Sequence, residues 1–295
     1  MSDTIVIIRT SSLPSWPDCE RRSAARLFRN LIEGFGYKLR RLPRGIGAAV
    51  GISVHASAAV SLAEKARCGV LPPESVAEDC ASDQLKELIA QEVEFDHAGG
   101  ATRNRNEAIA QATGMARLYH RKIAPTVEPI LVEERLEAEL QPGIILSGQP
   151  DLVAREPNQI RDLKTGVSLG SFSAQIGGYS MLARTPRPEH PEGIPIERAS
   201  IDFLRRVSPA KPQPDPVSQQ VPLADAETSA ANILRRIAQA LTTFREGDTE
   251  RRIRPGDPWS FMANPQSRLC TRRWCEAYGV EGFCSEWKTK ENYDA

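Results

Sequence analysis

The chain has 295 residues, equal numbers of basic and acidic side chains, and 40% hydrophobic residues. This composition is ordinary for a globular protein, and a net charge of zero gives no overall signal for nucleic acid. No apolar run reaches the roughly 18 residues of a membrane span, and MSDTIVIIRT lacks the basic and apolar regions of a signal peptide, so we expect a cytoplasmic protein without membrane contact.

The first half of the chain has the pattern of helices. Residues 20–33, 49–66 and 103–122 carry small or apolar residues at the spacing of a helix face, and His55 lies in the second of these segments. Residues 68–100 have no pattern that assigns them. Their two cysteines, Cys68 and Cys80, are interpreted as ordinary thiols.

The second half begins with strands, because short β-type runs follow one another from about residue 127 with turn residues between them. The loops are too short to act as clear linkers. We therefore predict one domain over residues 1–295, of the α/β (α+β) class. Its predicted strands are 127–140, 144–154, 159–166, 196–207 and 217–223, and its predicted helices are 171–184 and 224–246.

The stretch GQPDLVAREPNQIRDLKTG carries the first candidate chemistry. If residues 144–154 and 159–165 form a hairpin, Asp151 and Asp162 lie on adjacent strands, and cross-strand neighbours come within about 5 Å. Two carboxylates that close are stable when one is protonated or when a cation lies between them, and oxygen ligands suit Mg²⁺ or Mn²⁺. Lys164 follows Asp162 by two residues and so points to the same face of the strand.

An exposed polar hairpin explains these residues equally well when they are considered alone. Two features outside it favour an active site. Gln175 and Tyr179 are four residues apart on a predicted helix and share one face of it. His55 lies on an otherwise apolar helix, where it is either a core histidine or a metal ligand.

The cysteines are a third feature. Cys270, Cys275 and Cys284 lie within fifteen residues of an otherwise cysteine-poor chain. In a reducing compartment such a cluster is more often a set of metal ligands than of disulfides. Basic residues also gather at 21–44 and 251–273; such clusters are either solvated faces or phosphate contacts, and alone they do not decide a function.

Together these motifs resemble the RecB-like branch of the PD-(D/E)xK nuclease superfamily. The resemblance covers about residues 10–285 and implies a restriction-endonuclease-like core, in which helices flank a mixed central sheet. It implies a core at about 45–250, an N-terminal cysteine arm at 10–44 and a C-terminal cysteine segment at 255–285. The motifs that carry it are G-x-x-V-H ending at His55, Gly148-x-Pro150-Asp151, Asp162-Leu163-Lys164-Thr165-Gly166 and Gln175-x-x-x-Tyr179.

The resemblance also implies a role for each residue. His55, Asp151, Asp162 and the backbone carbonyl of Leu163 would bind the metal, and Lys164 would be the catalytic lysine. Gln175 and Tyr179 would order the site or contact DNA, and Glu134 would also belong to the site. A [4Fe-4S] cluster on Cys19, Cys270, Cys275 and Cys284 would join the two ends of the chain, although Cys-x4-Cys-x8-Cys is longer than the shorter family spacing, Cys-x2-Cys-x5-Cys, and four thiolates also suit zinc.

These features predict a Mg²⁺- or Mn²⁺-dependent DNA exonuclease of recombination, repair or phage DNA processing. Single-stranded DNA ends are the expected substrate, and a recombinase, annealing protein or helicase is a possible partner. The alternatives are a DNA-binding or scaffold protein that keeps the fold without chemistry, and a nuclease that acts on RNA.

Overall fold

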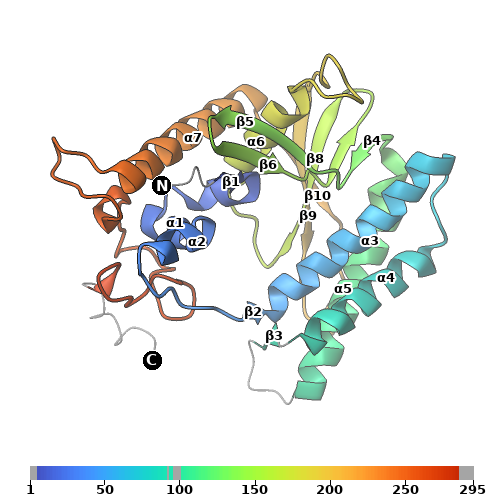
Figure 1. Cartoon of the computed structure of the whole chain (residues 1–295). Helices are drawn as coiled ribbons and strands as arrows, with labels where there is room; N and C mark the ends of the chain where they lie inside the picture. Colours follow the sequence, from blue (N-terminus) through green and yellow to red (C-terminus); the bar gives the residue numbers. More distant parts are fainter. Residues whose placement is uncertain (1–4, 92, 96–100, 286–295) are drawn as a thin grey trace.

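The computed structural model describes residues 5–91, 93–95 and 101–285, and it places a five-stranded sheet between two groups of helices (Figure 1). Its strands are β4 (Pro129–Val132), β7 (Leu152–Ala154), β8 (Gln159–Gly166), β9 (Arg198–Arg205) and β10 (Val217–Gln220). Their order is β10-β9-β8-β7-β4, and β8 and β9 are parallel whereas the other pairs are antiparallel. The mixed sheet confirms the predicted α/β class.

Side chains that alternate along the strands divide the core in two. Leu152 and Leu163 pack on one face with α3 (Ile46–Cys68), α4 (Glu74–Ala90) and α5 (Ala101–Lys122). Val153 and Ile160 pack on the other face with α6 (Ser173–Arg184) and α7 (Leu223–Glu246). Helices therefore cover both faces of the β7–β8 hairpin, and its successive side chains point alternately to one face and the other.

Two predicted strands are wrong as continuous elements. Residues 127–140 form β4 and then β5 (Leu136–Gln141), and residues 144–154 form β6 (Ile144–Gly148) and then β7. The strands β5 and β6 belong to a second sheet, of order β1-β6-β5, in which β1 (Val6–Arg9) runs parallel to β6. Backbone geometry marks both breaks: Glu133 has a φ of 49°, and Pro150 has no N–H to donate to a ladder. Glu133 and Asp151 consequently lie where the chain passes between the sheets.

The helix α3 is the part of the first half that matters for the site. Its buried face has small residues four apart, Ala49, Ser53, Ser57 and Ser61, which allow α4 and α5 to pack closely. Within the described residues α3 is the one helix with the length and hydropathy of a membrane span, but half of that window is buried in the fold, as in a core helix. The helix α4 lies in the unassigned segment 68–100; two of its four buried residues are alanines, which weakened its apolar pattern.

The two ends of the chain pack together. The predicted helix 20–33 is two helices, α1 (Glu20–Leu27) and α2 (Arg29–Gly34), and Trp16 and Phe28 pack against Phe261 of the C-terminal segment. Several basic residues serve this contact. Arg21 donates to the carbonyls of Pro258 and Phe261, and Arg40 donates to the carbonyl of Arg272. Those arginines therefore have a structural role in joining the two ends.

The remaining described elements are short. They are the 3-10 helices η1 (Thr10–Ser15), η2 (Ala124–Thr126) and η3 (Pro258–Ser260), and the two-residue strands β2 (Arg44–Gly45) and β3 (Val93–Glu94), which pair with each other. Of these, η1 bears on function, because it follows β1 and reaches the cavity described below.

Close packing of α6 on α7 gives a prediction about stability. A Cβ built on Gly177 would lie 2.0 Å from the carbonyl oxygen of Ala226 on α7, so the Gly177→Ala variant must separate the helices. We expect a loss of about 2–3 kcal/mol in the free energy of unfolding, measured by chemical denaturation. Gly114→Ala in α5 is the control: nothing lies within 4 Å of its Cβ, so stability should rise slightly. Equal stability of the two variants would contradict the close contact.

Candidate active site

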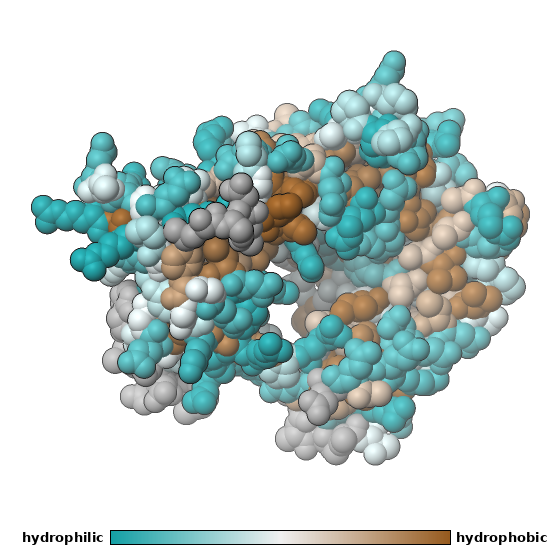
Figure 2. Space-filling model, viewed as in Figure 1, coloured by the Kyte–Doolittle hydropathy of each residue, from teal (hydrophilic) through white to brown (hydrophobic). Residues whose placement is uncertain are grey.

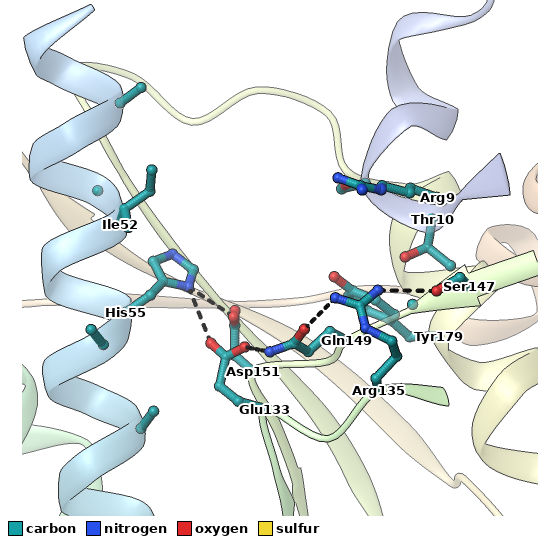
Figure 3. Close-up of a pocket in the computed structure, with 16 residues that line it drawn as sticks. Arg9, Thr10, Ile52, His55, Glu133, Arg135, Ser147, Gln149, Asp151 and Tyr179 are labelled. Atoms are coloured by element: carbon teal, nitrogen blue, oxygen red, sulfur yellow. Dashed lines mark hydrogen bonds and ion pairs between the residues drawn. The ribbon is translucent and has the colours of Figure 1, made fainter. Parts of the chain in front are cut away.

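A cavity of about 690 Å³ opens where the two sheets meet, and it is lined by α3, by Arg9, Thr10 and Ser11, and by the breaks between strands (Figure 3). Figure 2 shows a hollow beside the apolar residues that gather along α3. Three side chains from separate elements meet in the cavity: His55 from α3, Glu133 from the end of β4 and Asp151 from the start of β7. Their ligand atoms all lie within 4.8 Å of one another, which is close enough to hold one cation.

Asp151 links α3 to the hairpin. Its Oδ1 lies 2.8 Å from Nδ1 of His55, and its Oδ2 accepts a 2.6 Å hydrogen bond from the backbone N–H of Leu163. Burial alone would lower the pKa of His55, but the attraction of Asp151 and hydrogen bonds with Asp151 and Glu133 raise it to about 10. Burial opposes ionisation of Asp151, yet His55 and Leu163 keep its pKa below the ordinary value. His55 and Asp151 therefore form a charged pair.

Asp162 lies behind this trio, on β8, with 1% of its surface exposed. Its Oδ2 is 2.5 Å from Nζ of Lys164 but has no well-aligned hydrogen bond with any described residue. Burial, helped by repulsion from Asp151, raises the pKa of Asp162 to about 6 despite Lys164. Besides its contact with Lys164, this buried carboxylate offers the kind of oxygen ligand that a divalent cation prefers, so it suits a second cation.

The residues predicted on the following helix do reach the site. Nε2 of Gln175 donates to Oη of Tyr179 at 2.8 Å and lies 3.4 Å from Oδ1 of Asp162. The hairpin register also agrees with the prediction, because Leu152 pairs with Arg161 and so brings Asp151 to the level of Asp162. The structure therefore gathers His55, Asp151, Asp162, Lys164, Gln175 and Tyr179 around one centre.

The expectation that Glu134 belongs to the site is wrong, because the neighbouring Glu133 lies there instead. Oε1 of Glu133 lies 3.9 Å from Nδ1 of His55, whereas Glu134 is half-exposed and faces Arg187. Burial raises the pKa of Glu133, as expected of a carboxylate that shares a site with Asp151. The sequence offered two consecutive glutamates, and only the break in the strand decides which of them turns inward.

This pair gives a matched test of the metal site. We expect Glu133→Gln to weaken Mn²⁺ binding at least about 10-fold in calorimetry, because it removes one anionic ligand from the trio. Glu134→Gln changes the same residue type one position away and should leave the affinity unchanged. If Glu134→Gln had the larger effect, the assignment of Glu133 would be wrong.

The structure brings together the four cysteines that the resemblance singled out. Cys19, Cys270, Cys275 and Cys284 are buried, form no disulfide, and line one small cavity. The backbone N–H groups of Arg22 and Asn264 lie within 3.5 Å of Sγ of Cys19. Burial raises the pKa of the Cys275 thiol to about 12 and, against the opposing effect of Arg21, that of Cys284 to about 11.

Spacing of the sulfur atoms limits what the cysteine centre could hold. Among the described residues, His55, Glu133 and Asp151 form the one group of three candidate ligand atoms that all lie within 4.8 Å of one another. No three cysteine sulfurs in that part of the chain lie so close together. Cys68 and Cys80 lie elsewhere, on α3 and α4, and have no part in the cavity.

A protein-family model covers most of the residues described above. The family model described as "PD-(D/E)XK nuclease superfamily" matches residues 18–280, which include the cavity from His55 to Tyr179 and three of the four cysteines. No curated protein matches the chain.

Proposed function

Because the chain belongs to the PD-(D/E)XK nuclease superfamily, we propose that it is a Mg²⁺- or Mn²⁺-dependent DNA exonuclease. The observation that carries the proposal is the meeting of His55, Glu133 and Asp151 beside the buried Asp162–Lys164 pair. Nuclease chemistry follows from the family, whereas the DNA substrate, the preference for ends and the metal are parts of the proposal.

The residues fit one or two divalent ions. His55, Glu133, Asp151, Asp162 and the carbonyl of Leu163 would hold them, and a bound ion supplies Lewis acidity and lowers the pKa of water. Lys164, whose Nζ contacts Asp162, is positioned to orient or deprotonate the attacking water. The amide of Gln175 restrains Asp162 and Tyr179, so that the carboxylate keeps its direction when the strand enters.

The shape of the cavity supports a single-stranded substrate. Its volume of about 690 Å³ is that of a small-ligand pocket, and α3 faces η1 across it. A flexible single strand could thread between these walls. We therefore propose that single-stranded DNA ends enter first, in recombination, repair or phage DNA processing in the cytoplasm, with a recombinase, annealing protein or helicase as partner.

The cysteine centre supports a [4Fe-4S] cluster over zinc. Tetrahedral zinc with bonds of about 2.3 Å would bring the four sulfurs within about 3.8 Å of one another. No three sulfurs of the described cysteines come within 4.8 Å, which fits a larger group better. We propose that the cluster fastens the N-terminal arm to the C-terminal segment.

The test is digestion of end-labelled oligonucleotides with Mg²⁺ or Mn²⁺. We expect short products from single-stranded DNA, slower attack on duplex DNA and RNA, and no cleavage of a circular single strand. Cleavage of the circle would make the protein an endonuclease, and faster cleavage of RNA would favour the RNA-directed alternative. Binding without cleavage under every metal would favour the silent DNA-binding protein, although the filled Asp151, Asp162 and Lys164 positions argue against it.

A further inference from the structure

Two arginines lie in the same cavity across from the metal trio. Arg135 comes from the break between β4 and β5, Arg9 lies at the end of β1, and both line the cavity with His55 (Figure 3). Within the described residues neither has an acidic partner: Arg135 bonds only to neutral side chains, and no hydrogen bond or ion pair is found for the Arg9 side chain. In contrast, Arg161 and Arg29 are neutralised by carboxylates.

A neutral amide keeps the charge of Arg135 apart from the metal ligands. Nη2 of Arg135 donates to Oε1 of Gln149 at 2.9 Å, and Nε2 of Gln149 donates to Oε2 of Glu133 at 2.8 Å. Ser147 fixes the guanidinium from the other side, at 3.1 Å. Only one orientation of the Gln149 amide satisfies both neighbours, because a carboxylate only accepts and a guanidinium only donates.

This arrangement has an electrostatic consequence. Without Gln149 between them, Arg135 and Glu133 would be free to form an ion pair, which would cancel a charge that binds metal and a charge that binds an anion. With the amide interposed, the two side chains do not pair with each other, so Glu133 faces the cation site and Arg135 faces the cavity. A guanidinium held this way presents a fork of N–H groups that matches a phosphate.

We propose that Arg135 binds a phosphate of the substrate strand beside the scissile phosphate, that Arg9 binds a neighbouring phosphate, and that Gln149 positions Arg135 relative to the metal ligand Glu133. The proposal rests on the nuclease function proposed above and adds the contact that places the strand. Arg9 also lines a second cavity that contains Arg26, so the bound strand would leave past β1 and η1.

The binding test does not depend on cleavage. Affinity for a fluorescent single-stranded oligonucleotide is measured by anisotropy over a range of salt concentrations, with Asp162→Asn present in every protein to prevent digestion. Arg135→Gln and Arg9→Gln should each reduce the slope of log K against log salt by about 0.7, the value for one lost phosphate contact on a single strand. Arg155→Gln, at an exposed arginine in the turn after β7, is the control and should keep the full slope.

Gln149→Glu tests the positioning role. The new carboxylate would pair with Arg135 and repel Glu133, so we expect oligonucleotide and Mn²⁺ affinities each to fall about 10-fold, whereas Arg135→Gln should lower only the first. With cleavage-competent proteins, Arg135→Gln should raise KM more than it lowers kcat.

The outcomes separate this inference from the proposed function. If the wild-type protein digests DNA but Arg135→Gln keeps the wild-type slope and KM, the phosphate contact is wrong and the nuclease stands. If the slopes change as expected but the wild-type protein digests nothing, the phosphate contact stands and the hydrolytic function fails. An effect of Arg155→Gln as large as that of Arg135→Gln would reduce the contact to general surface charge and overturn the proposal.

Discussion

Replacing Asp162 with asparagine is expected to lower the rate of DNA cleavage by about 1,000-fold, the size of effect seen when one group that stabilises the transition state is removed. Asparagine keeps the shape of the side chain and its contact with Gln175 but removes the charge that would hold the cation. Initial rates on end-labelled single-stranded DNA with Mg²⁺ and Mn²⁺ measure the effect.

Unfolding of the Asp162→Asn variant must be excluded as the cause of its lower cleavage rate. The folded pKa of Asp162 is about 6, above its ordinary 3.8, so without metal its ionisation destabilises the fold as pH rises from about 4 to 6. The Asp162→Asn variant lacks this penalty. Its melting temperature without metal should therefore not fall below that of the wild type at pH 7, and the stabilisation that Mn²⁺ gives the wild type should shrink.

Lys164→Met is the companion variant, because methionine keeps much of the lysine stem and removes the ammonium. Cleavage should fall, whereas Mn²⁺ affinity should be retained, since Lys164 is a neighbour of the cation site and not a ligand. Unchanged cleavage in both Asp162→Asn and Lys164→Met would refute the assignment of β8 as the catalytic strand.

The hairpin and its helix were predictable because their geometry is local. Asp162 and Lys164 are two residues apart on one strand, Asp151 follows from the turn, and Gln175 and Tyr179 are four apart on a helix. Period-two and period-3.6 rules fix such relations without any knowledge of the rest of the fold. His55 required the resemblance, since a lone histidine on an apolar helix fits a core residue equally well.

The division into two sheets was not predictable, because it depends on partners far away in the chain. Val6 pairs with Ile144, which draws residues 144–148 away from the strand that continues as β7. Local propensity alone predicts one uninterrupted strand at residues 144–154. The same division turns Glu133 and Arg135 into the cavity, so the sequence alone missed both of them and with them the link through Gln149.

The second large effect is expected at the cysteine centre. Anaerobically purified protein should be brown and contain about four irons per chain, and Cys270→Ser should lose both the colour and the iron. Cys80→Ser, on α4, is the matched control and should keep both. A colourless protein with stoichiometric zinc would overturn the iron-sulfur assignment, and a protein with neither metal would overturn the metal centre itself.

Loss of the cluster should release one segment without unfolding the rest. After α7 the described chain has only the three-residue η3 as a helix or strand, so we expect ligation of the proposed cluster to supply much of the free energy that folds residues 255–285. Trypsin should therefore cut Cys270→Ser at Arg268 or Arg272 within minutes. The strand β8 is paired on both sides, with β7 and β9, and α6 packs against α7, so both should stay protected. Because Trp16 and Phe28 hold Phe261 without any metal, cleavage should stop beyond η3. Rapid digestion of the whole chain would instead mean that the cluster supports the nuclease core, and equal resistance of variant and wild type would mean that it supports neither.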